Sequence, residues 1–148
     1  MAQGLSYCGR QKLAVELINE QFDFSYGLKE IHWGYIGFIR FLAHDYRSAI
    51  DAFEFVEDSA PFIGAIQVAA LAHAGEIKRA KRELGIYLEK VKHHWNYEQQ
   101  PTDGDVANWV LQLFPIKERN DLENLVVGLS LAGLPTTQIV QDVNGIPA

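Results

Sequence analysis

Histidine and acidic side chains are the residues that most readily suggest chemistry in this sequence. Glu89 and His93 lie one helical turn apart, a spacing at which two side chains can hold one metal ion. No HExxH motif accompanies them, and His93 and His94 follow lysines, as expected at the C-terminal end of a solvated helix. We therefore expect neither a metal site nor another cofactor. The five histidines are His32, His44, His73, His93 and His94.

Nucleophilic catalysis has equally little support. Cys8 is the only cysteine, and a lone cysteine near a predicted helix end is typical of a buried structural thiol. The sequence has no Gly-x-Ser-x-Gly elbow and no glycine-rich phosphate loop. An acidic cluster, with several members three or four residues apart, is expected to form one solvated helix face; it comprises Asp51, Glu54, Glu57 and Asp58. We predict that the protein is not an enzyme.

Composition narrows the class of protein further. A length of 148 residues with 48% apolar content suits one compact domain with a real core. The formal net charge of −6 argues against binding to nucleic acid or to an anionic membrane surface. Residues 1–9 lack the apolar segment of a signal peptide, and a single cysteine excludes an intrachain disulfide. We therefore expect a cytoplasmic protein. The most apolar stretch, 60–75, is too short to span a membrane, so we expect no membrane span.

The elements that would position these residues are predicted to be helices in a repeat. Three alanines, Ala14, Ala49 and Ala80, each follow a turn and open an amphipathic run, and they lie 35 and 31 residues apart. This spacing is close to the roughly 34-residue period of helix–turn–helix units. Gly9 and Gly75 can adopt the left-handed geometry that ends a helix, whereas the turn at His44 must do so less easily. The predicted helices are 9–20, 28–43, 46–56, 61–74, 77–94, 103–114 and 120–132.

The middle unit resembles the tetratricopeptide repeat (TPR) family. It has Trp33, Ile36 and Gly37, then Ala49, Phe53 and Pro61, where that family has Trp, Leu, Gly, Ala, Phe and Pro. Arg40 stands at the family's tyrosine position, and the next unit has Gly64 and Gln67 at positions usually held by large apolar residues. The resemblance implies an all-α fold, namely a short TPR-like α-solenoid of antiparallel helix pairs.

The end of the chain carries a second resemblance. Residues 113–117, 121–125, 128–129 and 132–135 resemble the closing segment of the TPR regions of bacterial class III adenylate or guanylate cyclases and related signalling regulators. Here Ile116 replaces a phenylalanine of that segment. Asn120 is the predicted N-cap of the last helix, and Gly133 with Pro135 is its stop signal. No catalytic cyclase domain fits in this chain, so the resemblance implies a regulatory role.

By the same resemblance, the first helix of each unit lines a concave groove that binds a protein or peptide partner. The implied groove residues are Ile31, Phe38, Phe41, Leu42, Phe62 and His73. An apolar groove of this kind suits an amphipathic helix or an extended peptide. The alternative is that the terminal helices fold over the groove and make its phenylalanines part of the core. A homodimer that uses the aromatic face, and a small-molecule sensor, also remain open.

These predictions define one helical domain over residues 1–135. Its repeat units span about 9–27, 28–60 and 61–94, and a capping helix pair spans about 102–134. A polar loop at 95–101 separates the repeats from the cap. Residues 136–148 are expected to form a tail, disordered or weakly docked. The first unit is either a single capping helix or part of a longer array.

Overall fold

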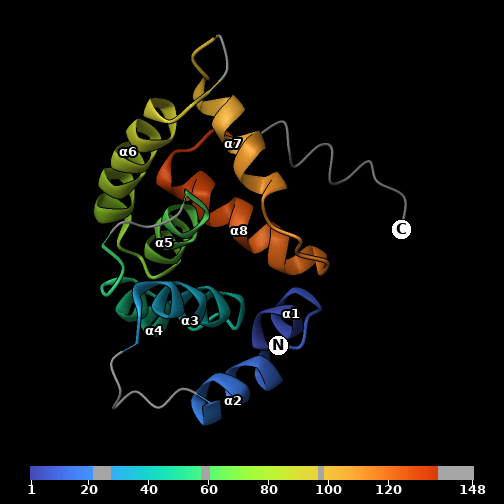
Figure 1. The fold of residues 1–148 in the computed structure, drawn as a ribbon. Helices are drawn as coiled ribbons and strands as arrows, with labels where there is room; N and C mark the ends of the chain where they lie inside the picture. The colour runs from blue at the N-terminus through green and yellow to red at the C-terminus, as the bar shows by residue number, and fades with distance from the viewer. Residues whose placement is uncertain (22–27, 58–60, 97–98, 137–148) are drawn as a thin grey trace.

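The computed structural model describes residues 1–21, 28–57, 61–96 and 99–136, and all regular elements in these ranges are helices (Figure 1). The all-α prediction is therefore confirmed for the described residues. No helix in these ranges has the length and apolar character needed to cross a bilayer. In chain order the helices are α1 (Ala2–Tyr7), α2 (Gln11–Gln21), α3 (Glu30–Leu42), α4 (Tyr46–Phe53), α5 (Pro61–His73), α6 (Ile77–His93), α7 (Asp103–Gln112) and α8 (Arg119–Ala132).

The predicted helix boundaries lie within three residues of those of α2 to α8. Helix α1 was not predicted, because its six residues are too few to show an apolar period. The predicted N-cap Asn120 is wrong: Glu118 is the cap, without a side-chain hydrogen bond. The amide of Lys117 donates to the carbonyl oxygen of Tyr7 at 3.0 Å, which holds the chain extended up to Glu118 and lets α8 begin directly after it.

The three repeat turns share left-handed backbone geometry, as the sequence predicts. The φ angles of Gly9 and Gly75 are 74° and 84°. His44 takes the same place in the middle turn with a φ of 62° and is the one non-glycine residue with positive φ in the described ranges. A side chain at such a φ brings Cβ close to the backbone, so this turn carries conformational strain that the other two avoid.

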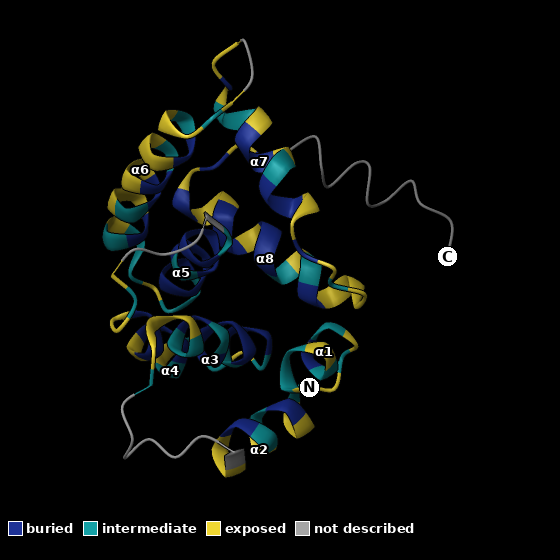
Figure 2. Ribbon diagram, viewed as in Figure 1, coloured by how far each residue is buried: buried dark blue, intermediate teal, exposed yellow. Residues whose placement is uncertain are grey.

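Helix α5 is the centre of the fold. It lies between α6 and α8, and it also contacts α3, α4 and α7 (Figure 1). Figure 2 shows most of α5 as buried, whereas α6 is exposed along its outer face. The residues of α5 that are at most 3% exposed are Ile63, Ala65, Ile66, Val68, Ala69, Ala70, Leu71 and Ala72. A helix that is apolar around its circumference is buried on every side, which fits this position.

Helix α8 is held against α5 by a close approach of two small residues. A methyl group placed on Gly128 would lie 2.8 Å from the Cβ of Ala69, so only glycine fits at this crossing. Leu125 and Leu129 of α8 are fully buried beside it. Such close contact between helices is the mark of a permanent core contact, because side chains of ordinary size would separate the two backbones.

Candidate functional site

The concave face predicted as a groove is covered by other parts of the chain. Phe38, Phe41 and Leu42 are only 2%, 0% and 1% exposed. The ring of Phe38 stacks on the ring of Phe114, with 5.7 Å between their centroids. Phe114 lies in the segment between α7 and α8. The prediction that these three side chains line an open groove is therefore wrong. The reason is that rings of the chain itself cover the two phenylalanines. Tyr7 of α1 and Phe114 lie against Phe38, and Tyr46 and His73 lie against Phe41.

The other three predicted groove residues do not form a common surface. Ile31, at the start of α3, is 40% exposed, whereas Phe62 is half-buried and meets the edge of Phe114. His73 donates from Nε2 to the carbonyl oxygen of Asn124 at 2.7 Å. His73 thus anchors α8 to the end of α5 and is not presented to a ligand.

A polar cluster fixes the first turn of α8 to the repeat turns. Asp121 is 5% exposed and accepts a hydrogen bond from the side-chain amide of Gln11. The Nε2 atom of His44 lies 3.9 Å from the other carboxylate oxygen. The Tyr46 hydroxyl donates to the side-chain oxygen of Asn124 at 2.9 Å. These contacts join α2, the α3–α4 turn and α8, so the cluster has a structural role.

The electrostatics of this cluster follow from its burial. Desolvation raises the pKa of Asp121, while the hydrogen bond from Gln11 and the field of His44 act in the opposite direction. Desolvation likewise raises the pKa of Tyr46, against the effect of its bond to Asn124. The hydrogen bonds of this cluster hold its members against one another and fix the start of α8.

The remaining chemical predictions concern single residues. Cys8 is exposed, so the expectation of a buried thiol is wrong; it caps the end of α1, where the chain turns towards solvent. Across the described ranges, no three metal-ligating side chains come together, and the Glu89–His93 pair has no third ligand there. Thr136 is 3% exposed, whereas the rest of the predicted tail and Asp58 lie outside the described residues.

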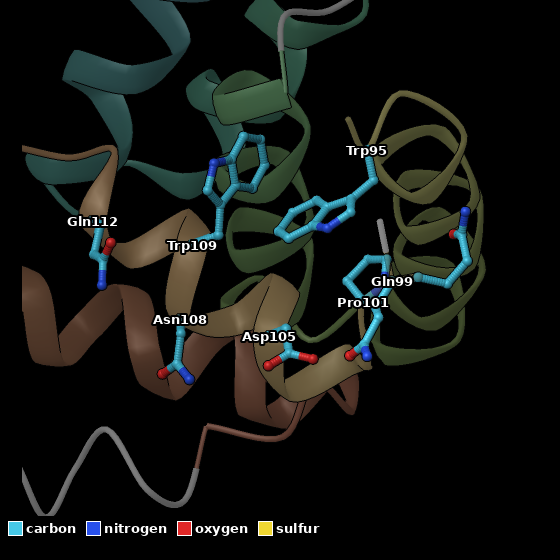
Figure 3. A pocket seen from close by; sticks show the side chains of 8 residues that line it. Trp95, Gln99, Pro101, Asp105, Asn108, Trp109 and Gln112 are labelled. Atoms are coloured by element: carbon cyan, nitrogen blue, oxygen red, sulfur yellow. The ribbon is translucent and has the colours of Figure 1, made fainter. Parts of the chain in front are cut away.

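One feature that could hold a ligand is an open trough between α7 and the loop that precedes it (Figure 3). Its volume is about 460 Å³, within the roughly 300–1,000 Å³ of most ligand pockets. We call it the tryptophan trough. Figure 3 shows the indole of Trp95 extending from the loop towards Trp109 on α7. The trough is lined by Trp95, Gln99, Gln100, Pro101, Asp105, Asn108, Trp109 and Gln112.

Local sequence features of α7 hold the trough in shape. Thr102 and Asp105 form a capping box: the Thr102 hydroxyl accepts from the Asp105 amide at 3.2 Å, and the Thr102 amide donates to the Asp105 carboxylate at 2.8 Å. Lys92 of α6 pairs with Asp103 of α7 at 2.7 Å, which joins the two helices at the mouth of the loop. Pro101, directly before the cap, is buried.

The described lining of the trough is aromatic and polar, with one charged side chain. Trp95 and Trp109 meet edge to face, with 5.8 Å between ring centroids. That charged side chain, Asp105, accepts from the amide and the hydroxyl of Thr102, and these bonds lower its pKa. Asn108 and Gln112 are exposed on the same helix face, so their amides can both donate to and accept from a ligand. The trough therefore suits an uncharged ligand that has hydrogen-bonding groups and an apolar part.

From its sequence this segment is expected to be a polar loop, and the trough is not predicted. The available signal was the gathering of two of the three tryptophans between positions 95 and 109, together with amides at helical spacing. Asp105, Asn108 and Gln112 recur at i, i+3 and i+7, which places them on one face of α7. Polar residues at that spacing next to tryptophans indicate a surface that is not simply solvated.

Comparisons of this chain with protein-family models, with curated proteins and with solved structures found no match.

Proposed function

We propose that this chain is a non-catalytic protein–protein interaction module, and that it binds its partner in the tryptophan trough. The observation that carries the proposal is the pairing of Trp95 and Trp109 above a row of exposed amides. Tryptophan gives a large apolar contact and one donor at a small entropy cost, and it is enriched where proteins bind one another. The concave face that carries the buried Phe38, Phe41 and Leu42 takes no part in this binding.

The helix order supports a TPR-like arrangement. Helix α3 packs on α4, α5 packs on α6, and α5 also contacts α3 and α4. This is the order of neighbours in consecutive helical hairpins that stack into a solenoid. Helices α7 and α8 close the stack, in the segment whose sequence resembles the ending of cyclase-associated TPR regions. We accordingly propose a cytoplasmic adaptor, or the sensory or regulatory part of a bacterial signalling protein.

The test is selection of ligands from a random peptide library, followed by fluorescence titration. A Trp33→Phe background removes the one tryptophan outside the trough, so the remaining emission comes from Trp95 and Trp109. We expect selected peptides to shift this emission and to bind less tightly when Asn108 and Gln112 are changed to Ala. A selection without binders, or binders that tolerate the double change, would refute binding in the trough.

A second candidate is self-association through the outer face of α8. Val127 and Leu131 are 49% and 48% exposed and lie one helical turn apart. A homodimer would bury this pair. Its test is the solution mass over a concentration series, repeated with Val127→Glu. A monomer at all concentrations would exclude this candidate, whereas a dimer lost in the variant would support it.

A further inference from the structure

We infer that the tryptophan trough recognises a proline-containing peptide segment in the polyproline II conformation. This inference rests on the proposed function and specifies its ligand. It follows from the juxtaposition of an edge-to-face tryptophan pair with uncharged amides on one face of α7. Proteins bind peptides in a few recurring ways, and the side chains that line the trough suit these ways unequally.

The charges of the described lining residues argue against ligands that are recognised through ion pairs. Among the described lining residues there is no arginine or lysine, so a phosphopeptide, an acidic motif or a free carboxylate would find no cation among them. The one carboxylate among these residues, on Asp105, accepts two hydrogen bonds from Thr102 and stays negatively charged. Because this carboxylate is exposed, solvent screens its attraction for a basic peptide, and the gain over a neutral peptide is small. An uncharged segment fits best.

The polarity of the α7 face and the helical structure of the described residues argue against two further ways of binding a peptide. An amphipathic helix needs an apolar wall at positions i, i+3, i+4 and i+7, but the α7 face in the trough carries Asp105, Asn108 and Gln112 beside Trp109. Addition of a strand needs a free sheet edge, and the described residues contain only helices and their connections. An extended segment that forms no hydrogen bonds within itself remains.

A polyproline II segment matches what the lining residues offer. Its backbone has no internal hydrogen bonds, so its carbonyl groups can accept from the side-chain amides of Asn108 and Gln112 and from the indole N–H of Trp109. Its proline rings can pack against Trp95 and Trp109. Because φ is fixed before binding, the ligand loses less conformational freedom than a flexible peptide does.

The dimensions agree with this ligand. The α7 face from Asp105 to Gln112 extends about 10 Å at a rise of roughly 1.5 Å per residue. A polyproline II helix rises about 3.1 Å per residue and has three residues per turn, so about one turn covers that length. The side chains of one ligand turn would then meet the tryptophan pair and the row of amides together.

The experiment titrates four probes into the Trp33→Phe protein and follows tryptophan emission. The probes are acetylated and amidated decaproline, a Gly-Ser peptide of equal length, an amphipathic helical peptide and maltotetraose. We expect saturable binding of decaproline and at least tenfold weaker binding of the Gly-Ser peptide. Changing both Asn108 and Gln112 to Ala should weaken decaproline binding by about fivefold or more, since two hydrogen bonds are lost.

The matched control is Asn120→Ala, which removes an exposed amide from α8, away from the trough, and should leave decaproline binding unchanged. Asn108 and Gln112 are themselves exposed, so their replacement leaves the core intact. The inference would be overturned if the Gly-Ser peptide bound as tightly as decaproline. It would also be overturned if changing both Asn108 and Gln112 to Ala left decaproline binding unchanged.

The remaining outcomes separate this inference from the proposed function. Trough-dependent binding of the helical peptide alone would overturn the proline specificity and leave a peptide-binding module. Trough-dependent binding of maltotetraose alone would overturn both, because the ligand would then be a carbohydrate. If the peptides selected from the library are not enriched in proline, the proline specificity alone is refuted, and the proposed peptide binding stands.

Discussion

The hydroxyl of Tyr87 allows a stability prediction of unusual sign. Tyr87, on α6, is 5% exposed, and its hydroxyl has no hydrogen-bond partner within the described part of the chain. A buried polar group without a partner costs about 1–3 kcal/mol, because it has lost its bond to water. Tyr87→Phe removes that group and keeps the ring. We therefore expect this variant to be more stable by about 1 kcal/mol, the lower end of that range.

The assay is urea unfolding at pH 7, with thermal unfolding as a second readout. A gain of about 1 kcal/mol corresponds to a rise of roughly 2–4 °C in Tm for a chain of this size. Tyr46→Phe is the matched control, because the Tyr46 hydroxyl donates to Asn124 at 2.9 Å. That variant should lose about 0.5–1.5 kcal/mol, the net value of one hydrogen bond.

The pH dependence gives an independent check. Burial raises the pKa of Tyr87 above its ordinary value near 10, so the folded state keeps its proton when the unfolded state releases it. The wild type therefore loses stability as pH rises above 10, by about 1.4 kcal/mol per pH unit from this group. The phenylalanine variant lacks this loss, and its advantage should widen at pH 10.5.

A clear loss of stability in Tyr87→Phe at pH 7 would refute the reasoning. It would mean that the hydroxyl has a partner, such as a water molecule in the adjoining cavity of about 160 Å³ that Gly64, Gln67 and Tyr87 help to line. An unchanged difference between pH 7 and pH 10.5 would show that the hydroxyl is accessible to solvent.

Three further predictions use the same unfolding assay. Gly128→Ala should cost about 1–3 kcal/mol, because the added methyl meets Ala69; equal stability would mean that α8 is loosely docked. His44→Gly should stabilise the protein by roughly 1 kcal/mol, since glycine adopts a φ of 62° without strain, and a loss would show that the imidazole contact to Asp121 outweighs the strain. Asp121→Asn should flatten the acid side of the pH profile: burial raises the Asp121 pKa, so its contribution is favourable at low pH and is lost as pH rises through that value. An unchanged profile would exclude this assignment.

The helices could be predicted from the sequence because their signals are local. Gly75 and Gly133 adopt positive φ at helix ends, as glycine at those positions indicates. The covering of the groove could not be predicted in the same way. Phe38 and Phe41 show the same apolar spacing whether they face a partner or another part of the chain. The close packing of Gly128 on Ala69 is likewise visible only in the structure.

The tryptophan trough could be predicted only in part, for a different reason. The tryptophans and amides are visible in the sequence, but their meeting depends on how the end of α6 and the start of α7 are placed, where the Thr102–Asp105 cap and the Lys92–Asp103 pair lie. Each of these contacts is common on its own. Their joint effect, which turns Trp95 towards Trp109, is visible only in three dimensions.

The central position of α5 has a consequence for synthesis on the ribosome. Its sequence is complete at His73, but the helix that covers its remaining face ends at Ala132. At about 5–20 residues per second, roughly 3–12 s pass between those two points. During that interval the nascent chain presents an alanine-rich apolar face with its final neighbour still untranslated. Chaperone demand during translation should therefore depend on how quickly codons 74–132 are read, and slow codons placed there should lower the yield of folded protein.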